Sequence, residues 1–401
     1  MATSLRPFRH LLLLALLAGH GSASLVAATP PDWENEQVFQ INREPARATF
    51  TSYATADQAL ANERGKSPWY KSLNSKDAWR FNWVPHPDLR PRDFFKPGFD
   101  DSSWKTIPVP ANWEMHGYGT PMYVSAGYAF KIDPPRVMGE PKSDYTTFKE
   151  RNPVGSYRRT FQTPANWAGR RVFIHFGGVQ SAFYVWLNGQ RIGYSEGSME
   201  PAEFELTPYL KDDGSKNLLA VEVYRWSDGS YLEDQDSWRF SGIFREVFLY
   251  STADVRIADF AVRTDLDENY RDAKLLIKPE ITTRRTDSLA GWTIRAQLHD
   301  AAGKPVLENP LSHEIEPILN RERKADIMND RTPQRGHAKF AWLEATISNP
   351  AKWTAETPNL YTLVLTLHDD KGEVVEATST RVGFREIEIR DGRFLVNGQP
   401  V

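Results

Sequence analysis

The residues whose types and spacing could do chemistry gather in one stretch, RWSDGSYLEDQDSWRFSGIF, which runs from Arg225 to Phe244. It holds four carboxylic acids within nine positions, namely Asp228, Glu233, Asp234 and Asp236. Two carboxyl groups about 5–5.5 Å apart suit a retaining glycosidase, and two about 6.5–9.5 Å apart suit an inverting one. Nothing in the spacing says which two acids would pair. The same acids could equally brace the loop by pairing with Arg225, Arg239 and Arg245, so both interpretations stay open.

This stretch is longer than an ordinary connection between two strands. The flanking strands are expected to end near Trp226 and to restart near Phe244, whereas hairpin loops usually take about 2–5 residues. Its apolar side chains favour an ordered loop over a disordered one. They are Tyr231, Leu232, Trp238, Phe240 and Ile243. Because an unpaired buried carboxylate is costly, we expect at least one acid to face a ligand, a cation or another domain.

A second candidate region is VPANWEMHGYGTPMYVSAGYAF, from Val109 to Phe130. Its rings alternate with glycines and belong to Trp113, Tyr118, Tyr123 and Tyr128. Rings and glycines together let a backbone approach a flat ligand closely, as in carbohydrate binding. They describe an aromatic corner of a β-sandwich core equally well.

Composition narrows the function classes. The chain has 401 residues and a formal net charge of −3, which gives no electrostatic case for nucleic acid as a partner. It has no cysteine, so neither a disulfide nor a Cys/His zinc cluster is available. The EF-hand, P-loop, H-E-x-x-H and G-x-S-x-G patterns are also missing from the sequence.

Residues 1–28 are predicted to be a secretory signal peptide. Arg6 and Arg9 precede the apolar run LLLLALLAG, and small residues follow it in GSASLVAA. The apolar run is too short to cross a membrane as a helix, which takes about twenty residues. We therefore expect cleavage after Ala23 or Ala28, a periplasmic or secreted protein, and no membrane partner.

The elements that must position the candidate residues are almost all strands. Residues 29–75 read as irregular and polar, and from residue 78 onward short strands alternate with turns such as Asn188-Gly189. This pattern predicts an all-β antiparallel sandwich. A second block, residues 253–384, shows six or seven strands, which suits an immunoglobulin-like sandwich. The charged run from Asn320 to Gly336 is expected to be a solvated loop, and residues 385–401 a hairpin with turns at 391–392 and 397–398.

Several motifs resemble, in order along the chain, the large bacterial β-galactosidases of glycoside hydrolase family 2. The motifs that carry the resemblance are DWENEQVFQINREPARATF, NWEMHGYGTPMY, VQSAFYVWLNGQRIGYS, RWSDGSYLEDQDSWRFSGIFREV, NPAKWTAETPNLYTL and VGFREIEI. The stretch around Asp236 is a long and specific match to the galactosidases. The VGFRE motif is shared more widely with β-glucuronidases and β-mannosidases of the same family.

The resemblance implies a jelly-roll sugar-binding domain with an N-terminal extension over residues 29–252, an immunoglobulin-like domain over 253–384, and the truncated start of a (β/α)₈ barrel over 385–401. In the family both catalytic glutamates and the magnesium ligands lie in that barrel. It therefore implies a fragment of a retaining β-galactosidase that contains no catalytic residue and is inactive alone. For the whole protein it implies a β-galactoside substrate and a homo-oligomer. The alternatives are a β-glucuronidase or β-mannosidase fragment, and an exported carbohydrate-binding protein without catalysis.

Two residues are assigned roles by the resemblance. Asp236 matches the residue that binds the galactosyl group and a sodium ion beside it. Ser125 matches a substrate-contacting asparagine of the family and departs from it, because a hydroxyl reaches less far than a carboxamide. We expect Glu233 and Asp234 to brace the loop.

Overall fold

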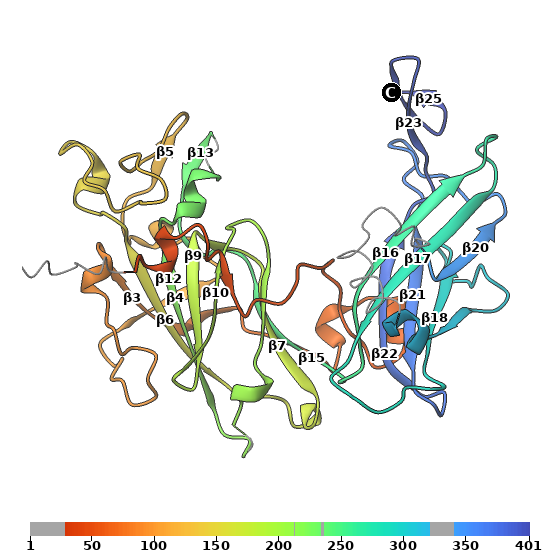
Figure 1. Ribbon diagram of the computed structural model, residues 1–401, viewed down its shortest axis with the longest axis horizontal. Coiled ribbons are helices and arrows are strands. Elements are labelled where there is room, and N and C mark those ends of the chain that lie inside the picture. Colours follow the sequence, from red (N-terminus) through yellow and green to blue (C-terminus); the bar gives the residue numbers. More distant parts are fainter. Residues whose placement is uncertain (1–28, 212, 234–235, 321–340) are drawn as a thin grey trace, which may run out of the picture. The chain divides into compact units, whose positions relative to one another are not determined.

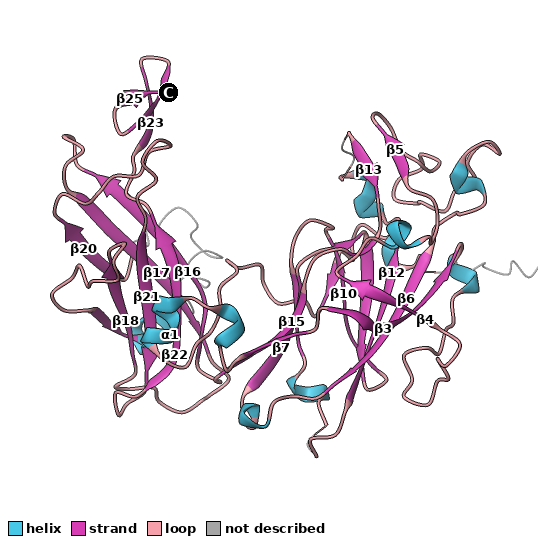
Figure 2. Ribbon diagram, turned by 180° about the vertical axis from the view of Figure 1, so that it is seen from behind, coloured by secondary structure: helices cyan, strands magenta, loops and turns pink. Residues whose placement is uncertain are grey.

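The computed structural model describes residues 29–211, 213–233, 236–320 and 341–401, and Asp32–Val401 form one compact unit. Figures 1 and 2 show that strands are its main regular elements, joined by loops and a few short helices, as the sequence predicts. The predicted signal peptide, Asp234 and most of the charged run at 320–336 lie outside the described residues. Within the described ranges, no helix is long and apolar enough to cross a membrane.

The first domain is a sandwich of a seven-stranded and a four-stranded antiparallel sheet. The larger sheet has the order β1 (Gln40–Ile41), β10 (Gln190–Glu196), β9 (Ala182–Leu187), β12 (Asn217–Tyr224), β6 (Val154–Phe161), β3 (Ser75–Val84) and β4 (Lys105–Val109). The smaller sheet has the order β11 (Ala202–Glu205), β7 (Arg171–Phe176), β15 (Val247–Thr252) and β2 (Tyr70–Ser72). Apolar side chains of both sheets fill one core, including Val221, Ile174 and Leu249. This is the jelly-roll that the sequence predicts.

Strand β12 shows how the local pattern produces this packing. Its alternate residues Leu219, Val221 and Val223 enter the core between the sheets. The opposite face is buried too, because the N-terminal segment covers it: Trp33 stacks on Tyr224 with ring centroids 4.1 Å apart. A strand buried on both faces makes the centre of the larger sheet rigid, and the loop after it starts from a fixed point.

Short paired segments and 3₁₀ turns complete the first domain. Two-stranded pairs join β5 (Met122–Val124) to β13 (Ser237–Arg239) and β8 (Val179–Gln180) to β14 (Gly242–Ile243). The 3₁₀ turns are η1 (Asp32–Glu34), η2 (Arg64–Lys66), η3 (Pro87–Leu89), η4 (Trp113–His116), η5 (Thr146–Phe148), η6 (Ala165–Trp167), η7 (Thr207–Tyr209) and η8 (Asp228–Tyr231).

The second domain is a smaller sandwich, and its described residues form seven strands, at the upper end of the predicted number. One sheet has the order β16 (Arg256–Leu266), β17 (Ala273–Thr282) and β20 (Leu343–Ile347). The other has the order β19 (Leu311–Glu314), β18 (Thr293–His299), β21 (Tyr361–His368) and β22 (Val374–Val382). The two sheets share a core of aliphatic side chains such as Ile277 and Leu365, as in an immunoglobulin-like fold.

The N-terminal segment also contacts this second sandwich. Tyr53 pairs with Ala377 of β22, and helix α1 (Ala56–Ala61) places Ala59 against Val364 and Ala377. The Ser379 hydroxyl donates to the Ala59 carbonyl at 2.5 Å. Part of the extension that we assigned to the first domain therefore packs on the second.

After the second sandwich the chain forms a small three-stranded sheet of β23 (Ile387–Arg390), β24 (Arg393–Val396) and β25 (Gln399–Pro400). Its two turns are the predicted ones, with Asp391, Gly392, Asn397 and Gly398 all at positive φ. One hairpin was predicted here, and the second turn adds a third strand.

Candidate functional site: an exposed ribbon of β5 and β13

The two candidate stretches meet in space as the antiparallel pair of β5 and β13, which Figure 1 shows at one end of the first sandwich. Ser237 lies opposite Val124, and Trp238 lies opposite Tyr123. Ser125 directly follows β5 and Asp236 directly precedes β13, so the register places these two residues side by side. Both are exposed. The fold thus brings together the two site residues that the sequence analysis chose, although they lie far apart in the chain.

Asp236 has a partner across the ribbon. The Tyr123 hydroxyl donates a short hydrogen bond to Oδ1 of Asp236. This bond to a carboxylate, with a smaller contribution from burial, raises the pKa of Tyr123, so the phenol stays protonated as a donor. The carboxylate therefore has one oxygen fixed by the protein while the residue as a whole faces solvent.

Two aromatic side chains lie beside these polar groups. Tyr123 is 54% exposed and Trp238 is 56% exposed, and their ring centroids are 5.8 Å apart. Large rings left this open cost free energy in water unless something covers them. A carboxylate, a hydroxyl and two open rings on one ribbon can together bind a polar ligand that has an apolar face, as a sugar ring does.

The ribbon is held from below by the buried side chain of Arg225. Its Nη2 donates to the carbonyls of Thr120 at 2.8 Å and Arg239 at 3.0 Å, which joins the start of β5 to the end of β13. Its charge faces the carboxylates of Glu114 at 3.6 Å and Glu150 at 3.9 Å. One of the two interpretations paired Arg225 with the acids of its own loop; its side chain instead points toward Glu114 of the other candidate stretch and Glu150.

The same interpretation paired Arg245 with the loop acids, and its described hydrogen bonds go to backbone carbonyls instead. Its Nη1 donates to the carbonyls of Met199 at 2.6 Å and Gly177 at 3.4 Å. Arg239 donates to the backbone carbonyl of Glu233 at 3.2 Å. Backbone carbonyls, which sequence patterns do not reveal, therefore take up several of these guanidinium donors.

Glu233 braces the loop, as we expected. Its carboxylate accepts hydrogen bonds from the Ser198 amide at 2.5 Å and from the Ser198 hydroxyl at 2.6 Å. The other carboxyl at the base of the loop, Asp228, lies against Glu196 of β10. Burial, then the neighbouring carboxyls of Asp228 and Glu233, raise the pKa of Glu196 to about 8. Of the three described loop acids, two are taken up at the base, and Asp236 lies at the tip.

The rings of the segment from Val109 to Phe130 divide between the two interpretations. Trp113 is fully buried in the core, so close to Gly155 that a Cβ there would come within 2.4 Å of the indole. Tyr118 packs against the same core, and Tyr128 donates from its hydroxyl to the carbonyl of Tyr231 at 2.9 Å. Tyr123 is the ring that faces outward.

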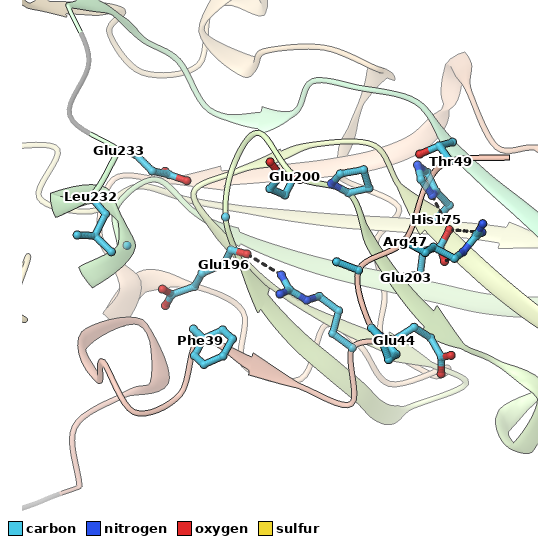
Figure 3. A pocket seen from close by; sticks show the side chains of 16 residues that line it. Phe39, Glu44, Arg47, Thr49, His175, Glu196, Glu200, Glu203, Leu232 and Glu233 are labelled. Atoms are coloured by element: carbon cyan, nitrogen blue, oxygen red, sulfur yellow. Dashed lines mark hydrogen bonds and ion pairs between the residues drawn. The ribbon is translucent and has the colours of Figure 1, made fainter. Parts of the chain in front are cut away.

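The first domain also has a cleft of about 520 Å³ that no sequence motif predicts. Figure 3 shows Phe39, Leu232 and Glu233 toward one end of it and Arg47, His175 and Glu203 toward the other. Glu203 accepts from Arg47 at 2.8 Å and lies 2.8 Å from Nδ1 of His175. Burial alone would raise the pKa of Glu203, but the His175 hydrogen bond and the Arg47 charge lower it to about 2. Because Arg47, His175 and Glu203 use their polar atoms on one another, we assign these side chains to stabilising the fold rather than to binding a ligand. No local pattern around residues 39–47 signals it.

The described fold and the ribbon define an all-β protein with two sandwiches and an exposed polar and aromatic edge. Two family models match it: "Glycosyl hydrolases family 2, sugar binding domain" over residues 70–253, and "Glycosyl hydrolases family 2" over residues 255–385. The chain belongs to glycosyl hydrolase family 2. The two matches meet between β15 and β16, where the first sandwich gives way to the second.

Curated relatives agree with this family. The chain is 42% identical over 372 residues to a protein named beta-galactosidase from Priestia megaterium, covering 92% of this chain and 33% of that protein. It is 36% identical to the beta-galactosidase of Vibrio cholerae, again covering 92% of this chain and 33% of that protein. The chain therefore spans about a third of the length of these relatives, and the described residues contain no (β/α)₈ barrel.

Solved structures share the fold at lower identity. A mutant of Bacteroides uniformis beta-glucuronidase 2 matches with a TM-score of 0.58 at 20% identity, covering 83% of this chain and 35% of that one. A beta-glycosidase from Bacteroides vulgatus matches with a TM-score of 0.57 at 22% identity, covering 82% of this chain and 36% of that one. These likenesses support the sandwich architecture.

Proposed function

We propose that this chain forms one wall of the active site of a retaining β-galactosidase that hydrolyses terminal non-reducing β-D-galactosyl residues. In this proposal Asp236 binds the galactosyl group, Ser125 contacts the substrate next to it, and Tyr123 and Trp238 offer their rings to the sugar. The observation that carries the proposal is the pairing of β5 with β13, which sets Ser125 beside Asp236 on an exposed edge. The two catalytic glutamates would come from a barrel domain.

Asp236 is also proposed to bind a sodium ion beside the sugar. A carboxylate oxygen is a ligand that hard cations prefer, and Asp236 is exposed enough to share one. Among the described residues no group of three or more Asp, Glu or His side chains could hold a metal ion, so Asp236 would need ligands from the substrate, water or a barrel. The magnesium of the family is assigned to the barrel as well.

A galactoside is favoured over a glucuronide or a mannoside by the curated relatives. They are named beta-galactosidases at 42% and 36% identity, whereas the glucuronidase structures are near 20%. A carbohydrate-binding protein without catalysis is the second candidate, since the open rings of Tyr123 and Trp238 suit it. We further propose export to the periplasm or the medium, and a homo-oligomer for the whole protein.

The test compares two preparations with a chromogenic β-galactoside. One is the chain of residues 29–401, and the other is the same chain joined to the remaining two thirds of the Priestia megaterium relative. We expect no turnover from the first and turnover from the second. In the second, Asp236→Asn should lower kcat/KM about 10- to 100-fold, the effect of losing one charged hydrogen bond. It should also abolish any stimulation by sodium.

The matched control is Asp213→Asn, an exposed aspartate in a turn of the same domain, which should leave the kinetics unchanged. Turnover by the first preparation would contradict the proposal and return the loop acids to the role of a catalytic pair. Unchanged kinetics of Asp236→Asn would reject the role of the ribbon. Sugar binding by residues 29–401, with no turnover in either preparation, would favour the binding protein.

A further inference from the structure

The cleft on the first domain has an open end, opposite the side chains that contact Glu203. Its volume of about 520 Å³ lies within the range of about 300–1,000 Å³ that is typical of small-ligand sites. At the open end Phe39 is 55% exposed and Leu232 is 89% exposed. Figure 3 shows Phe39, Leu232 and Glu200 around it. With Arg43, which also lines the cleft, these three residues are called the open end below.

The two apolar residues of the open end are held in place by their backbone. The carbonyl of Phe39 accepts a hydrogen bond from the Glu196 amide of β10 at 3.0 Å. Leu232 follows the turn η8, and its amide donates to the Gly229 carbonyl at 2.9 Å. Glu233, the next residue, is braced by two hydrogen bonds from one serine. A ring and an aliphatic group are therefore presented to solvent on a fixed frame, which costs free energy until a ligand covers them.

A hydrogen-bond donor and an acceptor lie near each other at the open end without satisfying each other. Nη1 of Arg43 donates to the Ser195 hydroxyl at 3.0 Å and to the Glu196 carbonyl at 3.1 Å. Among the described residues, no group accepts a hydrogen bond from Nε or Nη2 of Arg43. Burial lowers the pKa of Arg43, and the charge of the exposed Glu200 opposes this. The two side chains nevertheless form no ion pair among the described contacts, so both keep free hydrogen-bonding capacity.

The pair of Arg43 and Glu200 selects the chemistry of the ligand. An anion would be repelled by Glu200, and an ammonium group would be repelled by Arg43 and could not accept a hydrogen bond from it. A hydroxyl group accepts from a guanidinium and donates to a carboxylate, so it can bridge the two side chains. The exposed ring of Phe39 requires in addition an apolar surface on the same ligand. A sugar ring has both, and the cleft has room for more than one.

We infer that the open end of the cleft is a second carbohydrate-binding site, which takes a neutral oligosaccharide and is separate from the β5–β13 ribbon. None of the described residues that line the cleft belongs to β5 or β13. Gly229, Leu232 and Glu233 line the cleft, and Asp236 lies a few positions further along the same loop. One loop therefore serves both sites, with its base at the cleft and its tip at the ribbon. The second site binds its ligand whether or not Asp236 binds a galactosyl group.

Isothermal titration calorimetry of residues 29–401 tests the inference with two probes of equal length. The neutral probe is a linear β-linked galactotetraose, and the anionic probe is a tetragalacturonate. Phe39→Ala removes the ring of the open end. Phe394→Ala is the matched control, because Phe394 is a phenylalanine of similar exposure, 49%, on β24 and outside the cleft. Each titration is repeated in a Trp238→Ala background, which removes a ring from the ribbon, so that the remaining binding reports on the cleft.

We expect the neutral probe to bind with a Kd of about 1 mM, and the anionic probe to bind at least about tenfold more weakly. Phe39→Ala should weaken binding of the neutral probe about tenfold, in the Trp238→Ala background as well. Phe394→Ala should change the Kd less than about twofold. The inference is overturned if the neutral probe shows no saturable binding up to about 10 mM, or if Phe39→Ala leaves its Kd unchanged. Equal affinity for the two probes, or loss of all binding with Trp238→Ala, also overturns it.

Thiol labelling gives a second measurement in case Phe39→Ala unfolds at a lower urea concentration than the unchanged chain. The sequence has no cysteine, so Leu232→Cys introduces a unique thiol at a highly exposed position of the open end. The neutral probe should slow the labelling of this thiol and leave that of Val374→Cys, on β22, unchanged. An unchanged labelling rate of Leu232→Cys overturns the inference. Both measurements report binding and need no turnover, so a failure of the proposed function leaves them readable.

Discussion

The ribbon of β5 and β13 and the sheet of β23 to β25 are built alike, and they differ in what they expose. Each is a short antiparallel ribbon whose inner side is tied to a sandwich by an arginine and by hydrogen bonds to backbone carbonyls or carboxylates. The first exposes Asp236 and Ser125 beside two half-open rings. The second exposes Ile389 and Phe394 with no polar group between them.

This difference indicates two kinds of partner. A sugar offers hydroxyl groups and one apolar ring face, so a ribbon that combines a carboxylate, a hydroxyl and open rings suits it. A purely aliphatic and aromatic face has no donor or acceptor for hydroxyl groups and gains free energy only by excluding water. By their side chains alone, the first ribbon suits a polar ligand with an apolar face, and the second suits an apolar contact.

The anchor of the first ribbon should give the largest effect. Arg225→Ala removes the donors to Thr120 and Arg239 and leaves Glu114 without its cation in a fully buried place. We expect the free energy of unfolding of the first sandwich to fall by about 3–5 kcal/mol, as for other broken buried pairs. Urea denaturation measures it.

The control for that change comes from the second ribbon. Arg393→Ala alters an exposed arginine on β24 and should change stability by less than about 0.5 kcal/mol. If Arg225→Ala unfolds at the same urea concentration as the unchanged chain, the first ribbon is not held by its arginine, and the likeness between the two anchors fails.

The sequence predicts the strands and the turns of both ribbons but not these anchors. Local patterns determine the turns: Asn188-Gly189 and Asn397-Gly398 adopt the positive φ values that such hairpins need. Alternation likewise predicts that Val221 enters the core. The two acids that face Arg225, Glu114 and Glu150, lie 111 and 75 positions away in the chain, and no local pattern encodes which of several acids a long side chain will reach.

The candidate site, too, was predictable only where local composition or a motif marks it, and not where it depends on contacts between distant segments. The composition of the two long stretches indicated that both were ordered and chemically unusual, and the resemblance singled out Asp236 and Ser125. The pairing of β5 with β13 depends on long-range packing, so the contact of Tyr123 with Asp236 appears only in the fold. The cleft beside Glu203 was missed because its walls come from separate segments whose local patterns are ordinary.

The base of the first loop should give the next largest effect, and it depends on pH. Burial and nearby carboxyls raise the pKa of Glu196 to about 8, so the folded protein keeps this proton at pH values where the unfolded chain has lost it. The contribution of Glu196 to the free energy of unfolding is therefore full below about pH 4.3, its pKa in the unfolded chain. This contribution is lost as the pH rises toward 8. Glu196→Gln cannot ionise, so it should remove this loss, which amounts to about 3–4 kcal/mol between pH 5 and pH 8.

Urea denaturation at several pH values between 5 and 8 checks this. Glu200→Gln, an exposed acid in the turn that follows β10, is the matched control and should keep the pH dependence of the unchanged chain. A Glu196→Gln variant that loses stability with rising pH as steeply as the unchanged chain would show that Glu196 is already ionised in the folded protein.

The smallest expected effect concerns the phenol that ties the second ribbon to its sandwich. Tyr270→Phe removes the hydrogen bonds to Glu388 and from Arg390 and leaves the ring in place over Gly398. We expect the backbone amides of β23 and β24 to exchange with solvent several-fold faster, while global unfolding is unchanged, because only local opening becomes easier. Hydrogen exchange followed by mass spectrometry measures both.

Tyr123→Phe removes a similar phenol-to-carboxylate bond from the first ribbon and should leave exchange in β23 and β24 unaffected. If Tyr270→Phe leaves that exchange equally unaffected, the phenol does not help to hold the second ribbon, and the burial of Leu395 and the hydrogen bond from Asn397 suffice.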